Sequence, residues 1–320
     1  MKAAFYSETG GPDVLQYGEV AEPVCGPGDI AIRVAAVSVE GGDLLHRRIT
    51  PVEGGQRIGG YQAAGIVTEV GADVVGIAPG DSVVGFNWSG SHAEVFVVPA
   101  HFAYPVPAGA DLAMAATVPV AFGTAHDALM SYGALKSGET VLIHGAAGGV
   151  GIALVQIAKR AGATVIGTAS SADKMQRIKD LGCDHVINGR EGDIRAEVMR
   201  LTGESGADLA VDLIGGPKFA EVLAALRPRG RMVLVGFASG TQPVLDPAVI
   251  RQSGLSITGL MFGKVMHLPE TRAMIAGLLV DVAKGALTMP IDRTFPLSEA
   301  AEAHRHIEDN HPFGKVVLIP

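Results

Sequence analysis

The chain is poor in cysteine, in aromatic residues and in runs of like charge. Its 2 cysteines, Cys25 and Cys183, exclude a disulfide framework and indicate a reducing compartment, the cytoplasm. No stretch reaches about 18 apolar residues and the first residues carry charge, so we expect neither a membrane span nor a signal segment. The net charge of −8, with no basic run longer than Arg47-Arg48, argues against a nucleic-acid partner.

Apolar residues make up 48% of the 320, enough for two cores, and single cores stop growing near about 250–300 residues. Short β-type runs divided by glycine and proline occupy residues 1–119 and predict an irregular β-barrel. Residues 120–263 alternate strands with helices, which is typical of a doubly wound parallel sheet. The tail, 264–320, ends in a strand resembling the first part. We therefore predict an α/β protein with one domain from 1–119 and 264–320, a second from 120–263, and a cleft between them.

The strongest functional signal lies in residues 140–174. A buried strand leads into the run AAGGVG at 146–151, which opens a helix and is followed by a second strand. In the G-x-G-x-x-G fingerprint the second glycine lets backbone approach a diphosphate and the third lets helix pack on strand; Gly148 and Gly151 hold these places, while Ala146 replaces the first glycine. The helix start offers free N–H groups. The residues predicted to bind a dinucleotide are Ala147, Gly148, Gly149, Val150 and Gly151.

The end of the second strand selects the dinucleotide. An NAD site usually has a carboxylate here for the ribose 2′-hydroxyl, but this chain has Ala169, followed by Ser170, Ser171 and Lys174. Two hydroxyls and an ammonium suit a 2′-phosphate, so NADPH is the predicted cofactor. The alternative is that the two serines merely cap the next helix, and both roles are compatible.

Several motifs together carry a resemblance to a known family. They are MKAAFYSETGGPDVLQ at the start, PGDSVVGF at 79–86, AAGGVG, GADLAVDLIGG at 206–216 and FGKVVLIP at 313–320. The chain resembles the medium-chain dehydrogenase/reductase superfamily, within it the zinc-free, zeta-crystallin-like quinone oxidoreductases. The resemblance implies a GroES-like catalytic barrel, a Rossmann NADPH-binding domain, and hydride transfer to a quinone or activated enone. Reduction of an alkenal or enoyl double bond, or NADPH binding without catalysis, are the alternatives.

The chain departs from its zinc-dependent relatives at Gly60-Tyr61-Gln62, where those proteins have Gly-His-Glu. Tyrosine and glutamine do not make a zinc site, so we expect no metal. Without a Lewis acid, acceptors that are already electron-poor are favoured.

Three residues are catalytic candidates by this resemblance: Glu40, Tyr61 and Thr124. Glu40 replaces an asparagine that in relatives lies beside the nicotinamide. Two interpretations stay open: a carboxylate near the nicotinamide, or a surface or hinge residue before a helix. Asp43 is interpreted as a helix cap or as the ion-pair partner of Arg47. Thr124 is alternatively an ordinary threonine at a helix start.

The remaining candidates also come from the resemblance. Those predicted near the cofactor are Thr124, Arg190, Gly236, Phe237, Ala238, Phe262 and Lys315. Those predicted near the substrate are Gln62, Trp88, His92 and Phe262. Alternatives are a barrel-covering role for Trp88, a satisfied structural role for His92, and a solvated lysine opening an edge strand for Lys315. An apolar outer strand at 256–260 predicts a homodimer. The substrate and the proton donor, whether solvent, Tyr61 or Glu40, are left open.

Overall fold

The computed structural model describes residues 1–242 and 244–320, which divide into two compact units. Unit 1 comprises Met1–Val120 and Val265–Pro320, and unit 2 comprises Ala121–Lys264. The assignment of unit 1 to catalysis and of unit 2 to NADPH binding stays a prediction at this point.

Unit 2 is built on a six-stranded sheet in which every neighbouring pair is parallel. Val141, Leu142 and Ile143 in its central strand are fully buried, as expected for a strand covered on both faces. The spatial order is β11 (His185–Asn188), β10 (Thr164–Ala169), β9 (Thr140–His144), β12 (Ala207–Asp212), β13 (Leu226–Leu234) and β14 (Ser256–Gly259). This is the Rossmann order, so the predicted doubly wound sheet is confirmed.

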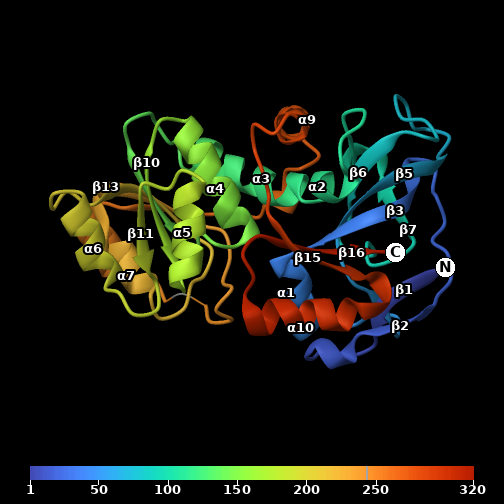
Figure 1. Cartoon of the computed structure of the whole chain (residues 1–320), viewed down its shortest axis with the longest axis horizontal. Helices are drawn as coiled ribbons and strands as arrows, with labels where there is room; N and C mark the ends of the chain where they lie inside the picture. Colours follow the sequence, from blue (N-terminus) through green and yellow to red (C-terminus); the bar gives the residue numbers. More distant parts are fainter. Residues whose placement is uncertain (243) are drawn as a thin grey trace. The chain divides into compact units, whose positions relative to one another are not determined.

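Helices pack against this sheet, as Figure 1 shows for α4 to α7. The bounds of these helices are α4 (Gly149–Arg160), α5 (Ala172–Asp180), α6 (Ile194–Leu201), α7 (Phe219–Ala224) and α8 (Pro247–Ser253). The preceding helix α3 (Val118–Asp127) begins in unit 1 and continues into unit 2. Strand β14 forms one edge of the sheet, where the sequence placed it. A homodimer through that edge stays a prediction.

Unit 1 is a β-rich domain around one apolar core that includes Ile30, Ile32, Phe96 and Val98. Its larger sheet runs β15 (Ile291–Pro296), β16 (Lys315–Ile319), β3 (Asp29–Val39), β5 (Gln62–Val70), β6 (Ser82–Phe86) and β8 (Ala103–Pro105), with β7 (Val95–Pro99) paired to β3. Its smaller sheet runs β2 (Gln16–Glu19), β1 (Lys2–Tyr6) and β4 (Arg57–Ile58). The predicted β-rich first domain is confirmed.

The helices of unit 1 are α1 (Gly41–Ile49), α2 (Leu112–Ala116), α9 (Pro269–Ala283) and α10 (Ala300–Asn310). Strand β16 lies inside the sheet, parallel to β15 and antiparallel to β3, with Val316 opposite Val39. This register brings Lys315, the first residue of β16, next to the end of β3. No helix in the described part of the chain is long and apolar enough to cross a membrane.

Candidate functional site

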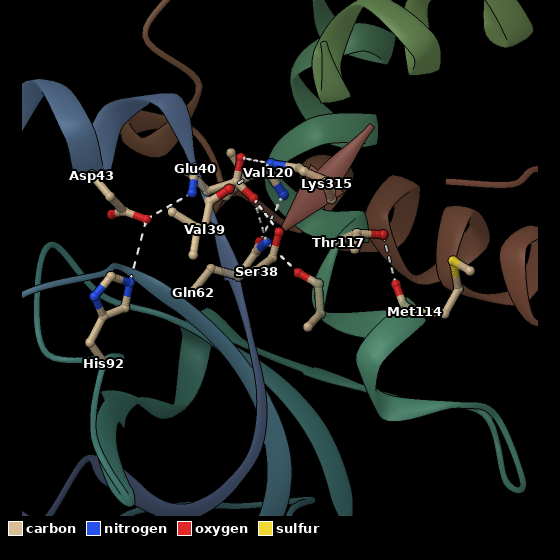
Figure 2. Close-up of polar contacts among 11 residues, drawn as sticks. Ser38, Val39, Glu40, Asp43, Gln62, His92, Met114, Thr117, Val120 and Lys315 are labelled. Atoms are coloured by element: carbon tan, nitrogen blue, oxygen red, sulfur yellow. Dashed lines mark hydrogen bonds and ion pairs between the residues drawn. The ribbon is translucent and has the colours of Figure 1, made fainter. Parts of the chain in front are cut away.

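Glu40 stands between the end of β3 and the first turn of α1, and only 2% of it is exposed. It is the N-cap residue of α1. Of the two interpretations from sequence, the residue does precede a helix, but it is buried rather than at the surface. Figure 2 shows that its carboxylate points toward side chains of β3, β5 and β16.

The Glu40 carboxylate is surrounded by donors. The Ser38 hydroxyl donates to Oε1 at 2.8 Å, the Gln62 amide lies 3.4 Å from the same oxygen, and the Lys315 ammonium pairs with Oε2. Lys315 is 5% exposed and its Nζ also lies 3.4 Å from the Val39 carbonyl oxygen. The interpretation of Lys315 as a solvated lysine on an edge strand is therefore wrong, because β16 is an interior strand.

Gln62 is fully buried and ties β5 to the start of α3. Its Oε1 accepts from the Val120 N–H at 2.9 Å (Figure 2). Its Nε2 donates to the Ala116 carbonyl. The amide oxygen and nitrogen are thus both engaged inside unit 1. Contact of Gln62 with a substrate stays a prediction.

Asp43 is a helix cap rather than the partner of Arg47. Its Oδ2 accepts from the Glu40 N–H at 2.8 Å, so the third helical residue satisfies a donor at the helix start. Arg47 instead pairs with Glu308 and approaches His304 Nδ1 at 2.8 Å.

His92 is fully buried without a hydrogen-bond partner on either ring nitrogen among the described residues. The nearest carboxylate oxygen, Asp43 Oδ2, is 3.8 Å from Nε2, and the His304 ring stacks edge-on at 5.3 Å. Burial lowers the pKa of His92 to about 3. Burial, with His92 and Arg47 nearby, lowers the pKa of His304 well below its usual value. His92 is therefore buried and unsatisfied, so the expectation of a satisfied histidine is wrong, and its contact with a substrate stays a prediction.

These histidines predict that acid destabilises the protein. Below about pH 6.5 the unfolded chain protonates His92 whereas the folded chain does not until about pH 3. The contribution of His92 to the free energy of unfolding is complete above the pKa of the unfolded chain. It falls by about 1.4 kcal/mol per pH unit as the pH drops through this window. Urea unfolding at pH 7, 6 and 5 should show a smaller loss for His92→Gln than for the wild type.

Asp43 changes the stability with pH in the opposite direction to His92, because burial raises the pKa of its carboxyl well above the ordinary value. This contribution is common to the wild type and His92→Gln, so it cancels in their difference. His185→Gln, at a half-buried histidine in unit 2, is the matched control. Equal pH slopes for the wild type and His92→Gln would contradict the interpretation.

A small recess lies beside Asp43 and holds about 10 Å³, roughly the space of one water molecule. We call it the Arg57 recess; its principal lining side chains are Tyr6, Asp43, His46, Arg57, Tyr61 and Trp88. Burial raises the pKa of Tyr61 well above its usual value, so its hydroxyl is a neutral donor. Burial and then Arg57 lower the pKa of His46. The recess thus joins two residues predicted from sequence, Tyr61 and Trp88.

Sequence reasoning missed Arg57 in this recess. Two ring contacts connect the predicted pair: Tyr61 packs on Phe86 at 5.9 Å, and Phe86 packs on Trp88 at 5.4 Å. The signal for Arg57 in the sequence was a basic residue within the glycine-rich segment 54–60. Its position near Tyr6 follows only from the pairing of β4 with β1.

The glycine turn of unit 2 has the geometry that a diphosphate requires. A Cβ on Gly151 would lie 2.2 Å from the Gly145 carbonyl oxygen, so this contact between helix and turn admits only glycine. A Cβ on Gly148 would meet nothing within 4 Å. Gly148 is the N-cap of α4 and supplies no side-chain cap, so the first N–H groups of the helix remain for an anion.

The adjacent strand end also fits a nucleotide with a 2′-phosphate. Ala169 ends β10 where a carboxylate would repel that phosphate. The Ser171 Oγ accepts from the Lys174 N–H at 3.4 Å and caps α5, so the alternative capping role is present. A hydroxyl that accepts in this way still has its proton to donate. Lys174 is half-buried on the first turn of α5.

The other predicted cofactor residues lie in different elements of unit 2, and their contacts with a cofactor stay predictions. Gly236, Phe237 and Ala238 form the loop after β13, where the Ala238 N–H donates to the Leu213 carbonyl at 3.2 Å. Phe262 is buried in a short 3₁₀ turn, and Arg190 is exposed after β11.

Thr124 and a buried histidine–aspartate pair are two further findings in unit 2. Thr124 is buried inside α3 rather than at a helix start. His144 Nδ1 lies 2.8 Å from Asp212 Oδ1, and both residues end neighbouring strands, β9 and β12. Asp212 Oδ1 also accepts from the Gly215 N–H at 3.0 Å. The pair, which sequence reasoning missed, fixes the loop that follows β12 beside the glycine turn.

Within the described ranges, no group of three or more histidine, cysteine, aspartate or glutamate side chains is placed to hold a metal ion. Zinc-independent chemistry stays a prediction, since it concerns the reaction.

Two family models match the chain. The alcohol dehydrogenase GroES-like domain matches residues 26–108, and the zinc-binding dehydrogenase model matches residues 149–277. A 2-haloacrylate reductase from a Burkholderia species is 34% identical, with 99% of this chain and 98% of that protein aligned.

Solved structures agree with the family models. A mycobacterial protein in complex with NADPH has a TM-score of 0.95 at 33% identity, and Escherichia coli quinone oxidoreductase in complex with NADPH has 0.94 at 28%, each covering 100% of both chains. The GroES-like and Rossmann domains predicted from sequence are therefore confirmed, and the chain belongs to the medium-chain dehydrogenase/reductase superfamily, in its zeta-crystallin-like quinone oxidoreductase group.

Proposed function

We propose that this protein uses NADPH to reduce a quinone or an activated enone without a metal ion. The observation that carries the proposal is the unobstructed start of α4 at Gly148, next to a strand end that has alanine instead of a carboxylate. The NADPH complexes of two similar structures support the cofactor. The quinone oxidoreductase and the 2-haloacrylate reductase among its relatives both support an electron-poor acceptor.

Bound NADPH supplies a hydride, and the acceptor gains that hydride and one proton to give a hydroquinone or a saturated carbonyl compound, with NADP⁺ as the other product. The chain's residues bind and orient the reactants. In this proposal the N–H groups at the start of α4 hold the diphosphate, and Ser170, Ser171 and Lys174 hold the 2′-phosphate. Positioning of this kind supplies much of the rate enhancement in such reactions.

Tyr61 is the side chain best suited to give the proton. Its hydroxyl is neutral and borders the Arg57 recess. The two carboxylate oxygens of Glu40 already contact the Lys315 ammonium and the Ser38 hydroxyl, so Tyr61 is preferred over Glu40. Solvent is the remaining source. A Tyr61→Phe variant distinguishes Tyr61 from solvent as the proton source, because its rate of acceptor reduction falls only if the Tyr61 hydroxyl donates the proton.

The decisive experiment mixes the purified protein with NADPH and a panel of ortho-quinones, para-quinones, enals and enones, and follows the absorbance of the reduced cofactor. Turnover with at least one class supports the proposal. NADPH binding without turnover of any acceptor would instead support a binding protein on the same fold.

Cofactor choice gives a separate prediction. Lys174→Glu should weaken NADPH binding about 10- to 100-fold, because a charge-assisted hydrogen bond to the 2′-phosphate contributes about 1.5–3 kcal/mol. NADH affinity should change much less. Fluorescence titration with both nucleotides measures this, and Lys179→Glu, exposed near the end of α5, is the matched control. Equal losses for NADPH and NADH would contradict the phosphate role.

A further inference from the structure

Arg57 is a half-buried cation that has no acidic partner among the residues the structure describes. Its Nη2 donates to the Trp88 carbonyl oxygen at 3.0 Å, and within the described chain no carboxylate oxygen lies within 4.0 Å of its guanidinium nitrogens. Arg47, by contrast, is paired with Glu308. A guanidinium held by one carbonyl keeps further N–H groups available for an anion.

The surroundings of Arg57 favour an anion over a cation. Tyr61 and Tyr6 present neutral phenols, because burial raises the pKa of each hydroxyl. His46 is a neutral imidazole at pH 7, because burial and Arg57 lower its pKa. Asp43 Oδ1 is buried without a partner, and the raised pKa of this carboxyl favours the protonated, donating form. The recess therefore offers a permanent positive charge beside groups whose pKa shifts disfavour their charged forms.

The size and shape of the recess limit what enters it. About 10 Å³ admits a single oxygen-sized group rather than a whole ring. Trp88 at its edge is 45% exposed, and its ring packs on Phe86 at 5.4 Å, so a planar molecule has an aromatic surface to lie against outside the recess.

We propose that the Arg57 recess binds a carboxylate of the acceptor, so that the preferred substrates are electron-poor alkenes or quinones that carry a carboxylate group. This inference rests on the proposed reductase function and names its substrate class. One carboxylate oxygen occupies the recess and accepts from Arg57, which leaves the Tyr61 hydroxyl for the proton transfer. The conjugated body of the acceptor lies against Trp88.

The test uses two acceptors that differ only in charge, 4-oxo-2-pentenoate and its amide, because the ketone activates the alkene in both. The wild type should prefer the carboxylate in kcat/KM. Arg57→Gln should lower the ratio of the two kcat/KM values about 10- to 100-fold, mainly through KM, since a hydrogen bond to a charged group contributes about 1.5–3 kcal/mol. Arg57→Lys should restore part of the preference.

Two controls separate recognition from structure. Arg48→Gln removes a cation from α1 whose side chain is half exposed and outside the recess, so the ratio should not move. Calorimetry with benzoate and benzamide, performed on the protein with NADP⁺, measures carboxylate binding without turnover. Benzoate should bind to the wild type more tightly than benzamide, and Arg57→Gln should remove that difference.

The outcomes distinguish this inference from the proposed function. Reduction of the amide and of neutral quinones with no preference for the carboxylate overturns the inference and leaves the reductase standing. Arg57→Gln could instead lower both kcat/KM values by the same factor and also lower the melting temperature. That result would assign Arg57 to anchoring Trp88 and would also overturn the inference. If no acceptor is reduced, the proposed function fails, and the benzoate titration still decides whether the recess binds a carboxylate.

Discussion

Replacing Lys315 by methionine should lower the free energy of unfolding by about 3–5 kcal/mol. The Lys315–Glu40 ion pair is buried, with 5% and 2% of the two residues exposed. Methionine removes the ammonium and leaves the Glu40 carboxylate without a counter-charge away from water. Urea unfolding at pH 7 measures the loss.

The double variant Glu40→Gln/Lys315→Met identifies the cause. Glutamine keeps an oxygen to accept from the Ser38 hydroxyl, which donates to Glu40 at 2.8 Å, but it carries no charge. The double variant should therefore recover about 1–3 kcal/mol relative to Lys315→Met, as coupled neighbours do in double-mutant cycles. Additive losses would show that lost packing, not the stranded charge, causes the effect.

A half-exposed ion pair supplies the control. Lys159 and Asp184 lie 2.8 Å apart with both side chains 34% exposed. Lys159→Met should lower the free energy of unfolding by at most about 1 kcal/mol, because water already screens such pairs. A loss as large as that of Lys315→Met would mean that burial is not the deciding factor.

Gly151→Ala should weaken NADPH binding about 10- to 100-fold, through loss of one charge-assisted hydrogen bond or more, and also destabilise the protein by about 1–3 kcal/mol. The added Cβ would lie 2.2 Å from the Gly145 carbonyl oxygen, a backbone atom, so the start of α4 must move away from the turn. The N–H groups that face the diphosphate move with it. Nucleotide titration and thermal unfolding measure the two effects.

Gly148→Ala separates binding from folding. Gly148 has extended backbone angles that any residue adopts, φ −84° and ψ 170°, and a Cβ there would meet nothing within 4 Å. Stability should stay within about 0.5 kcal/mol, whereas NADPH affinity should fall about tenfold, because the methyl group occupies the approach of the diphosphate. Unchanged affinity would place the diphosphate elsewhere.

Gly277→Ala is the matched control for both glycine variants. Gly277 is exposed inside α9 of unit 1, and a Cβ there would also meet nothing within 4 Å. Alanine is preferred over glycine in a helix by about 1 kcal/mol, so this variant should be as stable as the wild type or more so. Its NADPH affinity should not change.

Local pattern was sufficient for the fold and for the dinucleotide turn. Strand, glycine turn and helix follow one another within residues 140–160, and each is specified by neighbours in sequence: apolar runs for strands, glycine where backbone is crowded, serine where α5 begins. The alternation of strands and helices then restricted the sheet to a few parallel topologies.

Local pattern was insufficient for the charged groups of unit 1. Two alternatives drawn from it, a solvated Lys315 and a satisfied His92, were wrong, while the contacts of Lys315 with the cofactor and of His92 with the substrate stay predictions. The partner of Lys315 is 275 residues away in sequence, and His92 meets His304 from the far end of the chain. No short motif encodes such contacts.

The sequence by itself determined the α/β fold and the glycine turn that suits a dinucleotide, because these depend on residue periodicity and on backbone that only glycine allows, and its motifs carried the resemblance to the superfamily. Tertiary structure alone decided that Glu40 is buried against Lys315 and that Arg57 joins Tyr61 and Trp88 around one recess. The reason is strand register: pairing of β16 with β3 and of β4 with β1 sets which distant side chains share a low-dielectric environment, and that environment governs their charge and their chemistry.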